Sequence, residues 1–326
     1  MSGTYPGRVA LTVDNLSLEF RTRAGVVPAL DRVQFEVRRG ETVGVVGEQG
    51  AGKSVTACAV MGLLGAAAWM THGRIVFGGV DVTRATEPVM QKLRGSEIAM
   101  LVQNPRSALN PMRPIGWQIE EVLLHHVSVT RRMVRRQVLK AMARVQIPDA
   151  ERLYRAYPYE LSEELCQRVL MAMALSAQPT LLIADNPTAG FDITAQAAIM
   201  DLIKTISLGR DMATLLFTHD LALAAAYCDR MVIMYAGQVV EQAPTAVLLK
   251  APRHPYTAKL IGATLAGLTS WMEIGTIPGH APDLRGALPP CRFAARCDRR
   301  LTTCNTEPLP YTAIEVNHDV ACWNPL

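Results

Sequence analysis

The sequence predicts an α/β fold built on a mainly parallel sheet, and two observations lead to this prediction. First, short apolar runs alternate with helical stretches, and strands joined by helices run parallel in one sheet. These runs are residues 41–46, 97–102, 181–184, 214–217 and 231–235. Second, a glycine-rich loop directly follows the first run. With 326 residues, 49% hydrophobic and 19% charged, the chain can bury one large core plus an appendage.

Residues 47–54, which read Gly-Glu-Gln-Gly-Ala-Gly-Lys-Ser, fit the phosphate-binding pattern G-x-x-x-x-G-K-[ST]. Glycines let backbone N–H groups wrap an oligophosphate, and the following helix offers its positive N-terminal end. Lys53 would reach the β and γ phosphates, and Ser54 would ligate Mg²⁺. The candidate nucleotide-binding residues of this P-loop are Gly47, Gly50, Ala51, Gly52, Lys53, Ser54 and Val55.

A second element of a nucleotide site is the apolar run 181–184, which ends in Asp185. A short continuous apolar run of this kind is typical of a strand buried on both faces of a parallel sheet. An acid at the end of such a strand can bind the Mg²⁺ of a bound nucleotide. We therefore expect Asp185 to lie beside the ion held by Ser54.

Three further segments resemble motifs of the ABC-transporter ATPases. Leu161-Ser162-Glu163-Glu164-Leu165, followed by Gln167-Arg168, is similar to the signature LSGGQ and its trailing QR. Residues 217–220, Phe-Thr-His-Asp, resemble the switch-histidine loop, and residues 101–103, Leu-Val-Gln, resemble the Q-loop. The resemblance implies a RecA-like, mainly parallel core with an antiparallel β edge over residues 1–250. It also implies a helical subdomain at about residues 104–178.

The same resemblance implies roles for individual residues. His219 would be the catalytic switch histidine, and Gln103 would ligate Mg²⁺ and the attacking water while sensing a membrane partner. Asp192 would be the D-loop acid that contacts a second ATPase subunit. Phe20 stands where relatives carry an aromatic residue that stacks on adenine, but it fits a core position equally well.

The sequence departs from the family at the residue after Asp185. Relatives carry a glutamate there that polarises the attacking water, whereas this chain carries Asn186. Asparagine cannot accept a proton at neutral pH, and general-base assistance contributes about 10²–10⁴-fold to rate, or roughly 3–5 kcal/mol of barrier. We therefore expect the site containing Asp185 to bind ATP and to hydrolyse it slowly, with His219 sustaining residual activity.

The second departure is Glu163-Glu164, which replaces two signature glycines. In the family, the signature of one subunit contacts the γ-phosphate bound by the P-loop of the other. Side chains crowd that approach and carboxylates repel the phosphate, unless both point outward and merely suit the first turn of a helix. Ser162 is retained, so we expect outward-pointing glutamates and a weakened signature.

The two departures lie on one chain, so each composite site of a heterodimer would contain only one of them. A homodimer would contain both in both sites. This asymmetry predicts a paralogous ATPase partner with an intact glutamate and an intact LSGGQ.

The C-terminal region resembles that of oligopeptide, dipeptide and nickel importer ATPases. The resemblance rests on residues 253–257, Arg-His-Pro-Tyr-Thr, followed by Leu260, Pro278-Gly279 and Leu288-Pro289. Four cysteines with the spacing C-x5-C-x6-C-x17-C then follow. We expect residues 251–326 to form a small cysteine-rich extension.

The four cysteines of this extension are Cys291, Cys297, Cys304 and Cys322. In a reducing compartment, four thiols in a tail with little apolar core favour metal binding over disulfides. Zinc sites usually show closer C-x₂₋₄-C pairs, and the resemblance implies a [4Fe–4S] cluster with a structural role. Zinc, free thiols and incidental bridges remain alternatives.

Charge and hydropathy favour a peripheral subunit at the cytoplasmic face of a membrane. The first eight residues show no secretory signal, and the longest charge-free apolar stretch, residues 57–70, is too short to span a bilayer. The net charge of +4 is too small to indicate nucleic-acid binding. The basic residues around positions 131–140 fit either a nucleic-acid or lipid contact or the solvated face of an amphipathic helix, which we favour.

Three functions are compatible with these features. The favoured one is an ATP-hydrolysing subunit of a peptide-type importer, working with two transmembrane permeases, the paralogous ATPase and an extracytoplasmic binding protein. The loop at 104–114 would contact the permease. The second is a regulatory subunit of the same complex that binds ATP without hydrolysing it. The third is a soluble ABC protein, which would usually carry tandem domains or a coiled-coil insertion.

Overall fold

The computed structural model describes residues 8–23, 25–264 and 275–326. Residues 1–7, on which the expectation about a secretory signal rests, lie outside this range. The chain divides into two compact units. The first combines residues 1–84 with 215–326, and the second contains residues 85–214.

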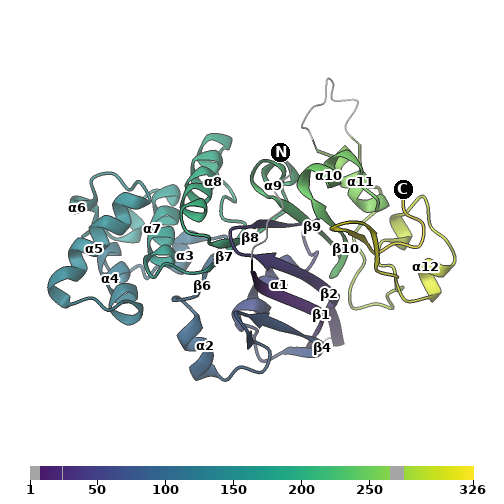
Figure 1. Cartoon of the computed structure of the whole chain (residues 1–326), viewed down its shortest axis with the longest axis horizontal. Helices are drawn as coiled ribbons and strands as arrows, with labels where there is room; N and C mark the ends of the chain where they lie inside the picture. Colours follow the sequence, from purple (N-terminus) through teal and green to yellow (C-terminus); the bar gives the residue numbers. More distant parts are fainter. Residues whose placement is uncertain (1–7, 24, 265–274) are drawn as a thin grey trace. The chain divides into compact units, whose positions relative to one another are not determined.

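An antiparallel sheet forms the N-terminal part of the first unit (Figure 1), in the order β2-β1-β4-β5. Its strands are β1 (Val9–Thr22), β2 (Gly25–Arg38), β4 (Ala68–Phe77) and β5 (Val80–Asp81). Buried and exposed residues alternate along β1, where Leu11, Val13, Leu16 and Leu18 are buried. The change in spacing between Val13 and Leu16 falls at one of the register irregularities of the pairing of β1 with β2.

The remaining strands of the first unit include both parallel and antiparallel neighbours. β3 (Thr42–Val46) pairs in parallel with β9 (Arg230–Tyr235), and β9 pairs antiparallel with β10 (Gln238–Pro244). β12 (His318–Val320) and β11 (Thr312–Glu315) extend this sheet, so the C-terminal extension contributes two strands. β8 (Ala213–Thr218) crosses the boundary between the units. In its described residues, this unit contains the helices α1 (Lys53–Met61), α9 (Leu221–Tyr227), α10 (Thr245–Lys250), α11 (Pro255–Gly262) and α12 (Thr303–Thr306).

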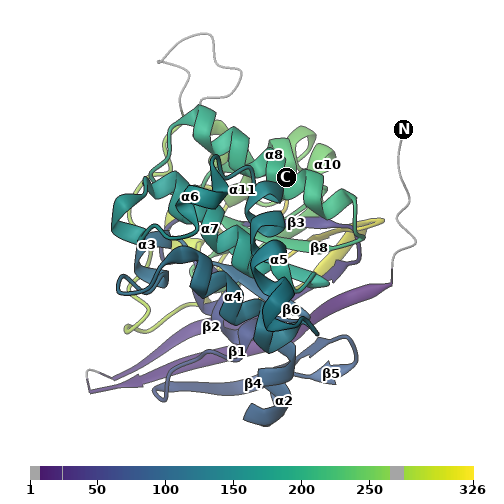
Figure 2. The same cartoon turned by 90° about the vertical axis from the view of Figure 1, so that its left-hand side faces the viewer.

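The second unit is mainly helical, around the parallel pair β6 (Ile98–Leu101) and β7 (Leu181–Asp185). Helices α4 (Ile115–His126), α5 (Arg131–Arg144) and α7 (Glu163–Ser176) pack against one another (Figure 2). The others are α2 (Glu87–Leu93), α3 (Pro105–Ala108), α6 (Ala150–Leu153) and α8 (Ile193–Leu208). On α5, Val134 and Val138 are buried while the basic residues between 131 and 140 are exposed, as expected of an amphipathic helix.

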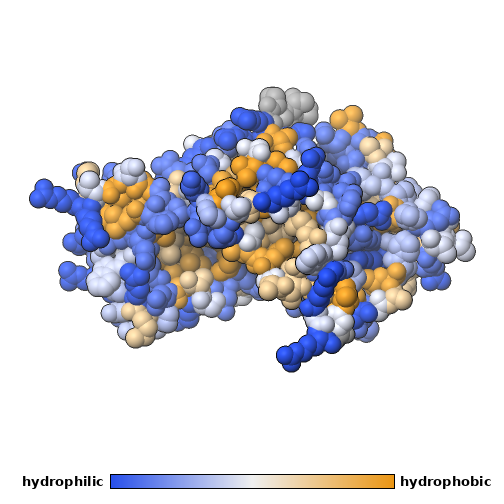
Figure 3. All heavy atoms as spheres, turned by 90° about the horizontal axis from the view of Figure 1, so that it is seen from below, coloured by the Kyte–Doolittle hydropathy of each residue, from blue (hydrophilic) through white to orange (hydrophobic). Residues whose placement is uncertain are grey.

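The five strands predicted from the sequence are all present, with ends that differ from the predicted ones by at most one residue. The division into a nucleotide-binding domain up to residue 250 and an extension from residue 251 remains a prediction. Within the described ranges, none of the helices combines the length and the hydropathy needed to cross a bilayer. On the face shown in Figure 3, apolar residues lie in patches among hydrophilic ones.

A buried carboxylate joins the C-terminal extension to β10. Glu241, fully buried, accepts hydrogen bonds from the backbone N–H groups of Arg253 at 2.7 Å and His254 at 2.9 Å. Its Oε1 also lies 2.8 Å from Nε2 of His318 in β12. A buried charge is tolerated only with such partners. Glu241 therefore ties the segment after α10 and strand β12 to the same point of the sheet.

Burial of His254 predicts a pH-dependent stability. Burial lowers the pKa of its imidazole to about 3, and its Nδ1 accepts the N–H of Tyr256 at 3.0 Å. Because the unfolded state takes up a proton below a pKa of about 6.5, acidification favours unfolding by up to about 1.4 kcal/mol per pH unit below that point. His254→Asn keeps a capping acceptor and removes the titration, so we expect a flatter dependence of unfolding free energy between about pH 6.5 and 4.5.

Urea denaturation at a series of pH values measures this slope. The control is His72→Asn, at an exposed position of β4, which should leave the slope as in the wild type. Equal slopes for His254→Asn and the wild type would contradict the prediction.

Candidate nucleotide-binding site

The P-loop connects the end of β3 to the start of α1, and its backbone requires glycine. A Cβ added at Gly47 would lie 2.1 Å from the backbone oxygen of Met234 at the neighbouring end of β9, closer than any side chain can approach. Gly52 has a φ of 99°, a left-handed conformation that side chains disfavour. The loop therefore follows a backbone path that requires glycine at both positions and ends at the N-terminus of α1, where an anion is favoured.

The side chain of Lys53 folds back into the P-loop. Its side chain is largely buried, and Nζ donates to the carbonyl oxygens of Gly47 at 2.8 Å and Glu48 at 2.9 Å. Ala51 is buried, Val55 is half-buried, and Gly50 and Ser54 are exposed. The structure thus brings the predicted P-loop residues together in an arrangement suited to phosphate binding.

Two other predicted residues of the first unit lie at strand ends. His219 is exposed directly after β8, and the next residue, Asp220, caps α9 by accepting the N–H of Leu223 at 3.0 Å. Phe20 is half-buried near the end of β1, where it pairs with Val27 of β2 and Ala68 of β4. The adenine-stacking role of Phe20 remains a prediction.

In the second unit, the parallel pair β6 and β7 places two predicted residues at one edge of the sheet. Asp185 is the last residue of β7 and is buried, whereas Gln103 follows β6 and is exposed. Carboxyl ends of parallel strands meet at the same edge and are the usual place for ligand contacts in α/β folds. The arrangement suits binding of a hard cation by Asp185 and Gln103.

Asn186 follows Asp185 with a φ of 44°, in the left-handed region that asparagine tolerates better than most residues. Its carbonyl oxygen accepts the N–H of Ala189, which closes a turn. Farther along, Asp192 is exposed and caps α8 by accepting the N–H of Ala195 at 2.9 Å. Contact of Asp192 with another subunit remains a prediction.

The signature-like segment begins α7. Ser162 is exposed and its Oγ accepts the N–H of Leu165 at 3.2 Å, so it serves as the N-cap. Glu163 is exposed, and Glu164 turns back along the helix to pair with Arg168 at 3.0 Å. Both glutamates therefore occupy a helical first turn, where acids are favoured.

The four cysteines of the extension lie near one another and form no disulfide. The N–H of Cys291 donates to the carbonyl oxygen of Cys304 at 3.1 Å. Burial raises the pKa of Cys291 to about 12, and the three other thiols raise it further. Burial likewise raises the pKa of Cys322 to about 11. Among the described residues, no three His, Cys, Asp or Glu side chains are arranged to hold a single metal ion.

Comparisons with protein families match both parts of the chain. Residues 30–189 match the ABC transporter model, and residues 240–304 match the model of the oligopeptide/dipeptide transporter C-terminal region. The chain is 40% identical over 314 residues to the dipeptide transport ATP-binding protein DppD of Bacillus subtilis, covering 96% of this chain and 94% of that protein. The chain therefore belongs to the ABC transporter family.

Within that family, a second relative matches the chain over nearly its whole length. The chain is 37% identical to the oligopeptide transport ATP-binding protein OppD of Salmonella typhimurium, covering 98% of this chain and 95% of that protein. Among solved structures, the ATP-binding cassette MJ0796 matches 72% of this chain and 98% of its own with a TM-score of 0.65 at 22% identity. The CbiO1 protein of Clostridium perfringens matches 74% and 91% with a TM-score of 0.64 at 25% identity. These likenesses confirm the predicted α/β fold of ABC type.

Sequence reasoning missed three contact residues of the P-loop. Glu48 was an unspecified position of the motif, yet its N–H donates to the hydroxyl of Tyr256 and its carboxylate pairs with Arg296. The His254-Pro255-Tyr256 run was a signal for the first contact. Nothing in the sequence connects positions 48 and 296.

A substitution at Gly47 tests the backbone requirement. Gly47→Ala should displace the Met234 carbonyl or the loop, and we expect ATP affinity to fall about tenfold or more, as is typical when packing at a close backbone approach is strained. Equilibrium titration with a fluorescent ATP analogue measures it. Gly209→Ala, where an added Cβ would meet only ordinary contacts at the end of α8, should bind like the wild type. Full affinity in Gly47→Ala would contradict the geometry.

Proposed function

We propose that this chain is an ATP-binding subunit that energises an ABC importer for peptides or related small solutes. The observation that carries the proposal is full-length similarity to dipeptide and oligopeptide transport ATP-binding proteins, which covers both the cassette and the C-terminal region. Closure of two such cassettes around ATP would drive the permeases. Substrate choice would belong to the permeases and the binding protein.

The proposed nucleotide is ATP with Mg²⁺. The P-loop backbone and Lys53 fit the phosphates, because the loop is held open by glycine and the lysine already lies inside it. Ser54 is exposed at the start of α1 and would ligate the ion together with Asp185 and Gln103. His219 would contact the γ-phosphate. Bound Mg²⁺ would neutralise charge that develops on the phosphates.

We further propose that hydrolysis at this chain's own Asp185 is attenuated, because Asn186 offers no general base. Ser162 would still contribute to the other composite site, since its hydroxyl is exposed and both neighbouring glutamates fit the helix. The productive site would then combine a partner's P-loop and glutamate with Ser162 of this chain. This division requires a heterodimer with a paralogous ATPase.

The remaining partners would be two transmembrane permeases and an extracytoplasmic binding protein, with this chain at the cytoplasmic face of the membrane. Exposed apolar side chains of the second unit support a docking role. Met112 lies in the loop expected to touch the permease, and it is 82% exposed. The regulatory alternative, ATP binding without turnover, differs only in the hydrolysis rate.

The donor set of the extension fits a [4Fe–4S] cluster. The other three thiols are close enough to Cys291 to raise its pKa electrostatically, and the segment has few helices and strands. Four cysteines are the usual ligands of such a cluster. A cluster is larger than one ion and so holds its cysteines farther apart. Cys291, Cys297, Cys304 and Cys322 would bind it, and it would cross-link the extension. Zinc is the alternative.

A pair of variants at position 186 tests whether the missing general base limits the rate of hydrolysis. Asn186→Glu restores a carboxylate and Asn186→Gln does not, while both carry the same backbone strain at φ 44°. We expect Asn186→Glu to hydrolyse ATP about 10²-fold or more faster than Asn186→Gln in the isolated chain. Phosphate release measures the rate.

The assembled complex with its paralogous ATPase completes this test. Its wild-type rate should greatly exceed that of the isolated chain, because the partner supplies the glutamate. An isolated wild-type chain as fast as the complex would refute the proposed division of labour. A complex as slow as the isolated chain would refute it as well. A fast complex, together with an isolated chain that binds ATP tightly and shows near-zero turnover, would favour the regulatory alternative, in which the partner carries out hydrolysis.

Metal analysis of protein purified without oxygen tests the extension. We expect a brown protein with about four iron atoms per chain. Cys291→Ser should lose the iron, whereas Cys58→Ser, at a half-buried position of α1, should retain it. A colourless protein with stoichiometric zinc would contradict the cluster and support a zinc site in its place.

A further inference from the structure

The P-loop residue Glu48 is held by the C-terminal extension. Nη1 of Arg296 lies 2.7 Å from Oε2 of Glu48, and Nη2 lies 3.2 Å from Oε1. The two side chains therefore form a bidentate ion pair. The Arg296 side chain is 6% exposed and that of Glu48 is 30% exposed. A carboxylate of the nucleotide loop is thus neutralised by a nearly buried arginine that lies 248 positions later in the chain.

Arg296 is itself fixed from several sides. Nε donates to the carbonyl of Pro278 at 2.7 Å, and Nη2 donates to that of Ile277 at 3.1 Å. Nη1 also reaches the hydroxyl of Tyr235, the last residue of β9, at 3.2 Å. A guanidinium with this many partners has little freedom to follow Glu48 if the loop moves, so it acts as a fixed anchor.

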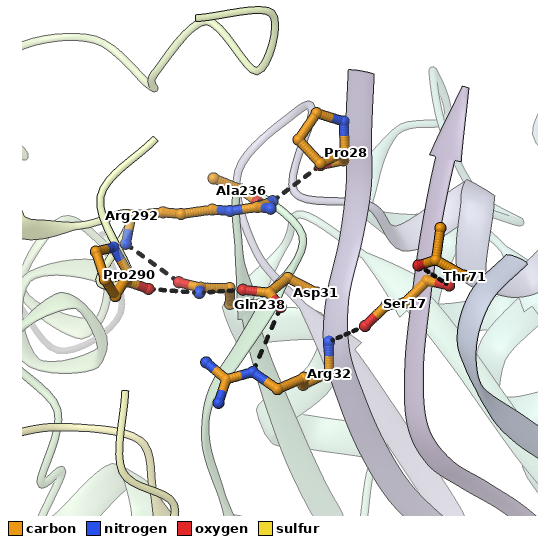
Figure 4. Close-up of polar contacts among 9 residues, drawn as sticks. All are labelled: Ser17, Pro28, Asp31, Arg32, Thr71, Ala236, Gln238, Pro290 and Arg292. Carbon is orange, nitrogen blue, oxygen red and sulfur yellow. Dashed lines mark hydrogen bonds and ion pairs between the residues drawn. The ribbon is translucent and has the colours of Figure 1, made fainter. Parts of the chain in front are cut away.

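The extension is connected to the P-loop backbone directly through Tyr256 and indirectly through the turn that follows β9. The N–H of Glu48 donates to the hydroxyl of Tyr256 at 3.1 Å. Arg292 donates to the carbonyl of Ala236 and, at 3.0 Å, to that of Pro28 (Figure 4). The next residue, Gly237, donates its N–H to the carbonyl of Ala51 in the P-loop at 2.9 Å.

Gln238 in β10 holds the segment around Arg292 in place (Figure 4). Gln238 donates to the carbonyl of Pro290 at 2.7 Å and to Asp31 at 2.8 Å, and it accepts the N–H of Arg292. The rings of Tyr235, Tyr256 and Phe293 pack between these contacts, with centroids 4.7 to 5.3 Å apart. The Glu48 side chain and the P-loop backbone are therefore both held by one cluster of packed and hydrogen-bonded residues.

We propose that the C-terminal extension positions the P-loop for nucleotide, with Arg296 as the positioning residue that neutralises and orients Glu48. The inference rests on the proposed binding of ATP at this loop. An unpaired carboxylate at Glu48 would repel a triphosphate and could turn toward it. The extension thus controls the affinity of the cassette for ATP without contacting the nucleotide.

A double-mutant cycle on the full-length chain tests this role. Arg296→Met should weaken binding of a fluorescent ATP analogue about tenfold, the usual consequence of removing a charged hydrogen-bond partner. The loss should be smaller for the ADP analogue, which carries less charge. The paired variant Glu48→Gln with Arg296→Met should bind more tightly than Arg296→Met alone, because an amide no longer repels the phosphates.

Thermal melting of each variant separates positioning from folding. If Arg296 were merely structural, the paired variant would be as impaired as Arg296→Met, which would overturn the inference. Lys259→Met is the matched control, because it removes the Lys259–Asp298 pair of the extension at 3.2 Å without touching the P-loop, and it should retain wild-type affinity. Unchanged affinity in Arg296→Met overturns only this inference. A wild-type chain that binds no ATP overturns the proposed function as well.

Discussion

The parallel pairing of β3 with β9 is the constraint on which the nucleotide site depends. It sets Val46 beside Ile233, so the chain leaves β3 directly against the Met234 carbonyl. Only glycine can make that turn. The same pairing places Tyr235 and the turn that follows β9 next to the P-loop, where the extension makes its contacts. The geometry of phosphate binding and the attachment of the extension thus have one origin.

Local features of the sequence were sufficient to predict the elements of the site. Strand ends were predicted to within one residue because the apolar runs are short and bounded by glycine or polar residues, and the P-loop pattern specifies its own conformation. The pairing of Glu164 with Arg168 was not predicted from the sequence, because the two side chains meet only once α7 has formed. Residues four positions apart lie on the same face of a helix, which brings the two side chains together.

Long-range contacts were outside the reach of the sequence. Glu48 and Arg296 carry no periodicity or motif that relates them, and surface charges of both signs are common enough that complementarity alone selects no pair. The same holds for Glu241 and His318, which meet only because β10 and β12 are neighbours. Interactions of this kind follow from topology, and the topology of the extension could not be derived from a loop-rich segment.

The buried Glu241 carboxylate has a consequence for the modular description of this chain. A cassette cut after α10 would retain that charge in its interior while losing the amides of residues 253 and 254 and the imidazole of β12. Such a fragment would carry an unsatisfied buried anion and expose the edge of β10 to intermolecular pairing. The buried carboxylate therefore favours folding of the cassette and its appendage as one unit, and a chimaera between two such proteins would have to exchange both parts together.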